Sequence, residues 1–151
     1  MKRIFLAGAI LFLIGHLVAC NSDVPVTAVT EVVQRGYAVA ITRVATHPFL
    51  ARFNLKVEIR TKSGCSASSE LFPDTGGVSR RNLYLDSSDR LYIIGQFDVR
   101  RFDPSQCLLE LIEFRSLESG LTYIGSFDTE PNQEWAYFSV SSRPEKPFEK
   151  L

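Results

Sequence analysis

The stretch Phe53-Asn54-Leu55-Lys56-Val57-Glu58-Ile59-Arg60 decides the fold class. Its apolar residues alternate strictly with polar and charged ones. Because successive side chains of a β-strand point to opposite faces of the sheet, a period of two predicts a strand with one face in a core and the other in water. Sheets with one wet face are mostly antiparallel, so this segment predicts an antiparallel β protein.

Two more segments fit the same interpretation. Over residues 37–42 the larger side chains Tyr37, Val39 and Ile41 alternate with Ala38, Ala40 and Thr42. Residues 135–141 are rich in aromatic and β-branched types, which are enriched in strands, and predict a last strand. Short strands separated by regular turns are typical of sandwiches and small barrels. We therefore expect an all-β fold, an immunoglobulin-like or transthyretin-like antiparallel sandwich, with a small barrel as the alternative.

A turn over residues 86–89 predicts a hairpin and its register. A three-residue loop places Leu85 opposite Leu91 and Leu83 opposite Ile93, whereas a two-residue loop breaks this match. A slip of one residue turns every side chain to the other face, so we expect the three-residue loop.

Residues 108–114, Leu-Leu-Glu-Leu-Ile-Glu-Phe, are ambiguous. They suit a strand, yet they would also suit one short helix. As a strand, 108–115 would form a second hairpin with 121–127 through the turn Glu118-Ser119-Gly120.

The N-terminus carries an export signal. Lys2 and Arg3 precede an apolar run over residues 4–18, which is shorter than the roughly 20 residues a membrane-spanning helix needs. A charged start followed by a short apolar run is typical of a secretory signal. The run ends in Leu17-Val18-Ala19-Cys20, which resembles the lipobox of bacterial lipoproteins.

This resemblance implies that residues 1–19 are a signal peptide and that Cys20 becomes the lipidated first residue. Residue 21 is Asn, whereas Asp at this place favours the inner membrane in enterobacterial lipoproteins. We therefore expect a lipid-anchored outer-membrane protein, facing the periplasm or the surface. The expected organisation is a lipidated tether over 20–27, one β domain over 28–142 and a flexible tail over 143–151.

The charge of the mature chain is nearly balanced, with 15 basic and 17 acidic residues. Nucleic-acid binding favours a strongly basic surface, so we expect no nucleic-acid partner. The expected partners are the lipid bilayer, through the acyl anchor, and a protein of the cell envelope.

Cys65 and Cys107 remain after lipidation of Cys20, in a compartment that permits disulfides. We expect one disulfide between them, with two buried free thiols as the alternative. A zinc site needs several closely spaced ligands, and His47 is the only histidine of the mature chain. We therefore expect no metal and no cofactor beyond the covalent lipid.

No residue pattern points to catalysis. His47 would have to serve as the base of a Ser-His-Asp hydrolase, and the chain lacks the Gly-x-Ser-x-Gly motif that supplies such a nucleophile. Glu110 and Glu113 fall on opposite faces of a strand. Asp86 and Asp89 are considered for weak calcium binding instead, but Asp and Ser are also ordinary turn formers and no EF-hand spacing appears. We therefore predict that the protein is not an enzyme.

Two arginine pairs, Arg80-Arg81 and Arg100-Arg101, are the candidate binding surface, because guanidinium groups bind carboxylates and phosphates with two parallel hydrogen bonds. The expected function is a non-catalytic protein-binding or structural module of the envelope, either a secretion or assembly subunit or an inhibitor. In size and class the chain resembles the sandwich lipoproteins of type VI secretion, and in general plan the small lysozyme-inhibiting lipoproteins. An envelope hydrolase is the alternative.

Overall fold

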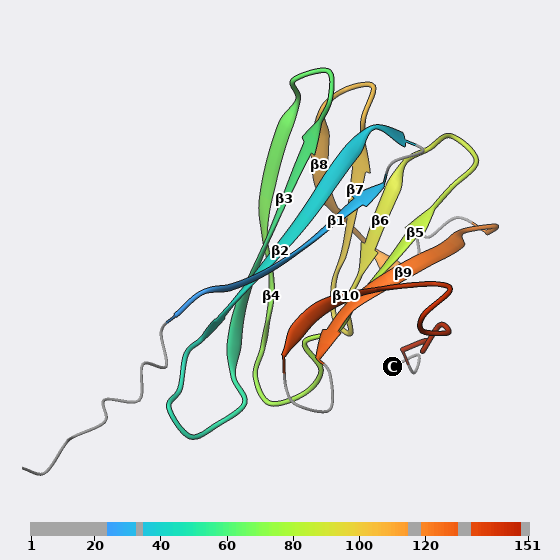
Figure 1. The fold of residues 1–151 in the computed structure, drawn as a ribbon. Helices are drawn as coiled ribbons and strands as arrows, with labels where there is room; N and C mark the ends of the chain where they lie inside the picture. The colour runs from blue at the N-terminus through green and yellow to red at the C-terminus, as the bar shows by residue number, and fades with distance from the viewer. Residues whose placement is uncertain (1–23, 33–34, 115–118, 130–133, 149–151) are drawn as a thin grey trace, which may run out of the picture.

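Two antiparallel sheets pack face to face in the computed structural model, which describes residues 24–32, 35–114, 119–129 and 134–148 (Figure 1). Strands make up 57% of the described residues, which contain no helix. The sheets do not close into a barrel, so the expected sandwich is confirmed. The four-stranded sheet has the order β1-β2-β3-β4, with β1 Val26–Val32, β2 Tyr37–Ala45, β3 Phe53–Thr61 and β4 Ser66–Asp74. The six-stranded sheet has the order β10-β9-β5-β6-β7-β8, with β5 Arg81–Leu85, β6 Leu91–Ile94, β7 Val99–Asp103, β8 Leu108–Ile112, β9 Thr122–Thr129 and β10 Trp135–Ser139.

The decisive stretch forms β3, between β2 and β4. Leu55, Val57 and Ile59 on its inner face are at most 1% exposed, and Lys56 and Glu58 point outward, where they form an ion pair. The inner residues of β2 are likewise buried. The period of two therefore predicted correctly which face of each strand enters the core.

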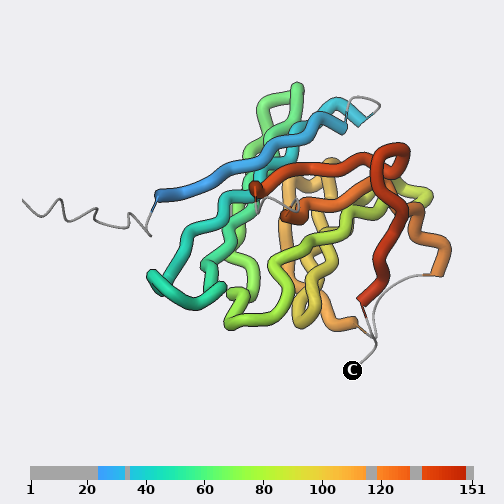
Figure 2. Tube along the Cα trace, turned by 60° about the horizontal axis from the view of Figure 1, so that its bottom comes forward, coloured from blue at the N-terminus to red at the C-terminus, as the bar shows by residue number. Residues whose placement is uncertain are grey.

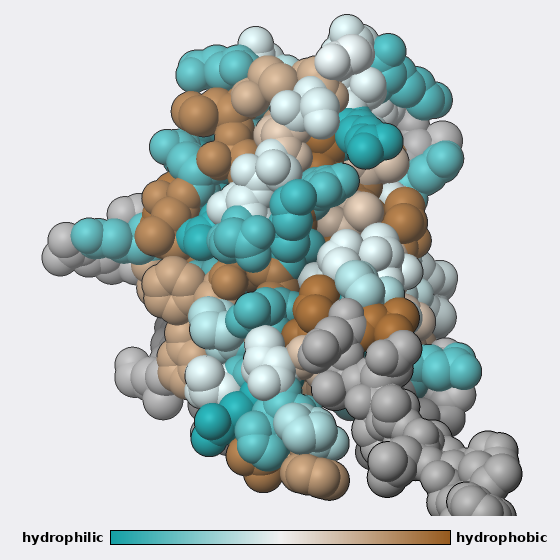
Figure 3. Space-filling view, turned by 90° about the vertical axis from the view of Figure 1, so that its left-hand side faces the viewer, coloured by the Kyte–Doolittle hydropathy of each residue, from teal (hydrophilic) through white to brown (hydrophobic). Residues whose placement is uncertain are grey.

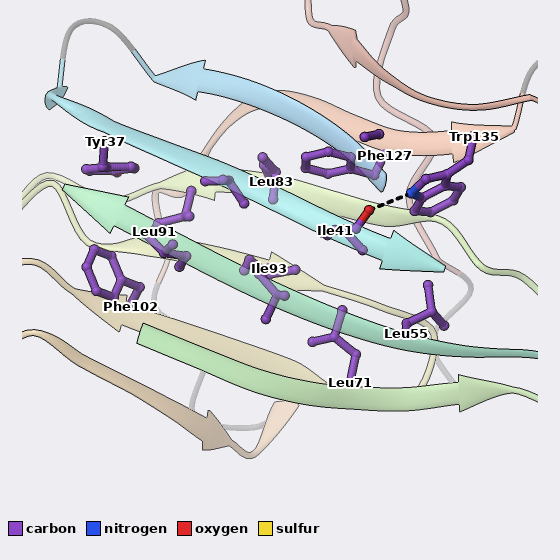
Figure 4. Close-up of a cluster of buried hydrophobic side chains, with 14 residues drawn as sticks. Tyr37, Ile41, Leu55, Leu71, Leu83, Leu91, Ile93, Phe102, Phe127 and Trp135 are labelled. Carbon is purple, nitrogen blue, oxygen red and sulfur yellow. Dashed lines mark hydrogen bonds between the residues drawn. The ribbon is translucent and has the colours of Figure 1, made fainter. Parts of the chain in front are cut away.

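Side chains from both inner faces form the main core (Figure 4). The largest are Tyr37, Phe102, Phe127 and Trp135. The Trp135 indole Nε1–H donates a hydrogen bond of 2.9 Å to the carbonyl oxygen of Ile41, which links the two sheets. Because the one polar atom of this indole is bonded, the ring enters the core without an unsatisfied donor.

The β5–β6 hairpin has the predicted register, with Leu85 opposite Leu91 and Leu83 opposite Ile93. The last residue of its three-residue loop, Asp89, has φ +65°. A three-residue hairpin loop commonly ends in such a left-handed residue, and Asp tolerates this conformation better than most residues.

The second expected hairpin is wrong. Residues 108–112 form strand β8, not a helix, but β8 pairs only with β7 at the edge of the sheet. Strand β9 instead lies between β5 and β10, where Phe127 reaches the core. The turn at Ser119 and Gly120 shows where the chain reverses, but it does not determine which strand edge accepts the next strand.

The sandwich has two ends, which contain different sets of turns. The disulfide end contains the β3–β4, β5–β6 and β7–β8 turns. Here Cys65 and Cys107 form the predicted disulfide, with Cα atoms 5.8 Å apart, which joins one sheet to the other. The loop end contains the connections β2–β3, β4–β5 and β6–β7, at the bottom of Figure 1.

A second, smaller core lies on the outer face of the six-stranded sheet, around Tyr84 and Tyr92. The described part of the expected tail, residues 143–148, lies along this face, as the red segment of Figure 2 shows. The Tyr84 hydroxyl donates to the Glu145 carboxylate at 2.8 Å, and the Asn82 amide donates to the carbonyl of Lys146 at 3.0 Å. The part of the tail that the structure describes is therefore bound to the domain.

Candidate functional site

Two of the four candidate arginines lie inside the protein. Arg81 is 2% exposed and Arg100 is 6% exposed. The guanidinium of Arg81 donates to the carbonyl of Phe72 at 2.6 Å and to that of Ser79 at 3.1 Å. These bonds fasten the connection between β4 and β5, so Arg81 performs a structural task at the loop end.

Asp98, in the β6–β7 turn, is the counter-charge of both buried arginines. Its carboxylate lies 3.6 Å from Arg81 and 3.9 Å from Arg100, and it accepts a hydrogen bond of 3.0 Å from the backbone N–H of Phe72. Burial lowers the pKa of Arg81, and the charge of Asp98 opposes that shift. A buried charge needs such a partner because its transfer from water is costly.

Arg100 crosses between the sheets. It donates to the carbonyl of Glu70 at 2.7 Å and to the Ser69 hydroxyl at 3.1 Å, both on β4. Its inward direction follows from the strand period, since Phe102, two residues on, enters the core. The sequence showed that Arg100 and Arg101 face opposite sides, but not which side is inside.

The other two arginines also have partners. Arg101 forms a salt bridge with Glu110 across the β7–β8 pair, with an N–O distance of 2.5 Å. The Arg80 guanidinium lies 4.5 Å above the ring of Phe148. The four arginines therefore do not form the exposed binding surface that we expected.

His47, considered as a catalytic base, and Asp86, considered for calcium, are each bonded within their own loop or hairpin. His47 Nδ1 accepts hydrogen bonds from the backbone N–H groups of Phe49 and Leu50 at 3.1 and 3.0 Å, within its own loop. Asp86 is bonded within the β5–β6 hairpin, where its carboxylate accepts from Arg90 and from the N–H of Ser88. The absence of catalysis stays a prediction.

Among the described residues, His, Cys, Asp and Glu do not gather in any group of three or more that could hold a metal ion. The same part of the chain has no helix with the length and hydropathy of a membrane span. Cys20, the predicted lipidation site, lies outside the described residues.

A cavity of about 270 Å³ lies at the loop end between the β4–β5 connection and the β6–β7 turn. The Asp74 carboxylate on its wall accepts from the N–H groups of Gly76 and Gly77, at 2.9 and 2.7 Å, and from the Ser79 hydroxyl. Arg81, a second polar wall residue, is held by the carbonyls described above. These groups hold the connection in place, which is a structural role.

The apolar edge of the six-stranded sheet is the feature that sequence reasoning missed. Strand β8 is the last strand in the sheet order, and in the described protein no strand pairs with its outer edge. Leu108 is 43% exposed, Leu111 is 55% exposed and Phe114, just beyond the strand, is 44% exposed. The available signal for this apolar edge was the composition of residues 108–114, where only two glutamates interrupt the apolar side chains.

Soluble proteins protect an edge strand with charges, prolines or bulges, because an exposed edge can pair with another chain. The one charged residue of β8 is Glu110, and it is engaged by Arg101 on the neighbouring strand. The β8 edge, defined as Leu108–Ile112 with Phe114, is therefore an unpaired strand edge with exposed apolar side chains.

Comparisons with known proteins supply no relative from which a role could be transferred. No family model matches the chain, and no curated protein or solved structure matches it.

Proposed function

We propose that this protein is a lipid-anchored, non-catalytic module of the bacterial cell envelope that binds a protein partner through the β8 edge. The observation that carries the proposal is the open apolar strand at the end of the six-stranded sheet. The Cys20 anchor holds the module at the outer membrane. A secretion or assembly subunit and an inhibitor are the two roles of this kind.

The resemblance of Leu17-Val18-Ala19-Cys20 to a lipobox supports the anchor. Each buried methylene contributes about 0.8 kcal/mol, and two or more acyl chains make attachment stable. The disulfide agrees with an oxidising compartment outside the cytoplasm, because such bonds are rare in the cytosol.

The geometry of β8 supports a partner that adds a strand. An incoming strand would hydrogen-bond to the outer backbone groups of β8, and its side chains would meet alternate residues of the edge. Leu108 and Leu111 offer apolar contacts beside those bonds. Main-chain pairing supplies affinity, and the side-chain contacts supply specificity.

Acyl labelling tests the anchor. Cells that produce the full-length protein are fed an alkyne fatty acid, and the labelled protein is detected after membrane isolation. We expect label on the wild type, and we expect Cys20→Ser to remain an unlabelled, unprocessed precursor. Normal labelling of Cys20→Ser would refute the anchor.

Photocrosslinking in living cells tests the edge. A photoreactive phenylalanine analogue replaces either Leu111 on β8 or Val140 beyond β10, at the opposite edge of the same sheet. The two positions are matched, because each side chain is 55% exposed. We expect one reproducible crosslinked species from position 111 and none from position 140; equal patterns from both would contradict the proposal.

Introducing a charge at the β8 edge tests whether this edge is needed for the activity of the protein in cells. A central interface residue contributes about 2 kcal/mol or more, which is roughly thirty-fold in affinity. We therefore expect Leu111→Arg to lose complementation of a deletion strain at normal protein level, while Val140→Arg keeps it. His47→Ala should also complement. If His47→Ala alone abolished activity in a folded, abundant protein, the hydrolase alternative would replace this proposal.

A further inference from the structure

We infer that the tip of the β2–β3 connection, residues 46–52, dips into the membrane that holds the lipid anchor, so that the loop end of the sandwich faces the bilayer. This inference rests on the anchor at Cys20 proposed above. The tip would form a second membrane contact, made by protein side chains. Two contacts together would define the orientation of the domain relative to the membrane.

The tip carries the most exposed large apolar side chain among the described residues, that of Phe49. Phe49 is 87% exposed and Leu50 is 48% exposed, and these two residues follow each other at the point of the loop. Figure 3 shows apolar side chains at the lower tip of the molecule, where the β2–β3 connection lies. Adjacent large apolar residues at a protruding tip are unfavourable in water and favourable in a lipid interface.

Several backbone N–H groups of the tip are hydrogen-bonded within the tip itself. The N–H groups of Phe49 and Leu50 both donate to His47 Nδ1, and that of Arg52 donates to the carbonyl of Leu50 at 2.7 Å. Thr46 N–H donates to the Arg52 carbonyl at 2.9 Å, and Pro48 has no N–H. Backbone donors left without partners are costly in a lipid environment, so this internal bonding lowers the cost of insertion.

The charge of the tip also suits a lipid surface. Residues 46–52 contain Arg52 and no acidic residue. An arginine beside apolar residues can extend to the headgroups while the apolar side chains enter below them, and anionic lipids attract the positive charge. Apolar side chains beside a single arginine therefore suit the interface of a bilayer that contains anionic lipid.

The distance to the proposed anchor places the tip at the same membrane. Val26, the first residue of β1, follows Cys20 by six positions in the sequence, and a chain of that length reaches at most about 20 Å. Val26 pairs with Arg43, near the end of β2 from which the tip emerges. From that level β1 runs towards the disulfide end for a further 20 Å or so, so the loop end is the end nearer to the acyl chains.

Tryptophan fluorescence on the anchored protein tests the inference. Full-length lipidated Phe49→Trp is reconstituted into vesicles of phosphatidylethanolamine and phosphatidylglycerol, a part of which carries bromine on the acyl chains. Because Phe49 is almost fully exposed, this exchange leaves the core intact. The matched control is Ser87→Trp, in the exposed β5–β6 turn of the disulfide end. Trp135 is common to both proteins, and the wild type supplies its signal for subtraction.

We expect the added emission of Phe49→Trp to shift to shorter wavelength and to be quenched by brominated lipid, and that of Ser87→Trp to be unquenched and typical of water. Leu50→Trp should behave like Phe49→Trp. If the protein floats with the vesicles while Phe49→Trp and Leu50→Trp keep solvent-like, unquenched emission, the tip contact is refuted and the anchor stands. If the wild-type protein does not float with the vesicles, the anchor itself fails and the inference with it.

Discussion

The two ends of the sandwich differ in what they expose and in how they are held. The disulfide end is covered by polar turns and is fixed by the bond between Cys65 and Cys107. The loop end exposes Phe49, Leu50 and Phe97 and is held from inside by the buried cluster of charges around Asp98. The turns of the disulfide end are thus polar, and a covalent bond holds that end together. The loop end exposes apolar side chains, and buried ion pairs hold it together.

This difference separates stability from surface function. The disulfide at one end and the buried charges at the other hold the two sheets together, so the exposed side chains of the turns can serve another purpose. At the disulfide end the turns suit water, whereas at the loop end the β2–β3 tip suits lipid. The β8 edge runs between the two ends and stays accessible in either environment.

The largest expected effect is at the loop end. Asp98→Ala removes the ion-pair partner of two buried arginines, Arg81 and Arg100. Breaking a buried ion pair in this way costs about 3–5 kcal/mol. Urea unfolding followed by circular dichroism should show a strongly lowered midpoint.

Glu58→Ala is the control for Asp98→Ala, because it breaks the exposed pair with Lys56 on the outer face of β3. The urea midpoint of Glu58→Ala should differ little from that of the wild type. Equal midpoints for Asp98→Ala and the wild type would mean that the loop end is not held by this cluster.

A somewhat smaller effect is expected at the disulfide end. The bond closes a loop with a sequence separation of 42, and its loss should lower the free energy of unfolding by about 2–4 kcal/mol. The double variant Cys65→Ser, Cys107→Ser is compared with the wild type in urea, with and without reductant. Reductant should shift only the wild type, and a wild type insensitive to reductant would show that the bond does not stabilise the fold.

The smallest expected effect concerns pH at the disulfide end. Burial alone would raise the pKa of Asp86, but hydrogen bonds from Arg90 and Ser88 outweigh it and the pKa is lowered. A carboxylate with a lowered folded-state pKa contributes stability above its unfolded pKa, about 3.9, and loses that contribution as pH falls through the folded-state value.

Asp86→Asn should therefore be less stable than the wild type by about 1 kcal/mol at pH 7, and the difference should shrink as the pH falls below about 4. Thermal unfolding across this range measures it. A difference that is constant with pH would show that the Asp86 charge contributes nothing beyond the shape of its side chain.

The sequence predicted what local periodicity determines. The alternation in residues 53–60 identified Leu55, Val57 and Ile59 as core residues, and the turn chemistry of 86–89 set the register of Leu83 and Leu85. The count of cysteines, one for lipid and two left over, predicted the disulfide.

The sequence did not predict what depends on long-range pairing. A turn signal at Gly120 could not show that β9 joins β5 and β10 instead of β8. The two arginine pairs resembled a surface because charged residues are rarely buried, and the burial of Arg81 and Arg100 depends on Asp98 in a distant turn. The exposure of Leu111 follows from the place of β8 at the sheet edge, which the residues of β8 alone do not encode.

The two ends of the sandwich are proposed to face different surroundings, with the loop end at the membrane. Energy transfer from a single donor dye to acceptors in the lipid headgroups measures the height of each end above the bilayer. Ala51→Cys and Ser87→Cys place the donor at the loop end and at the disulfide end of the anchored, full-length protein. The nine-residue strands β2 and β3 separate the ends by about 30 Å. We therefore expect strong energy transfer from position 51 and weak energy transfer from position 87. Equal transfer from both positions, or stronger transfer from position 87, would contradict this orientation.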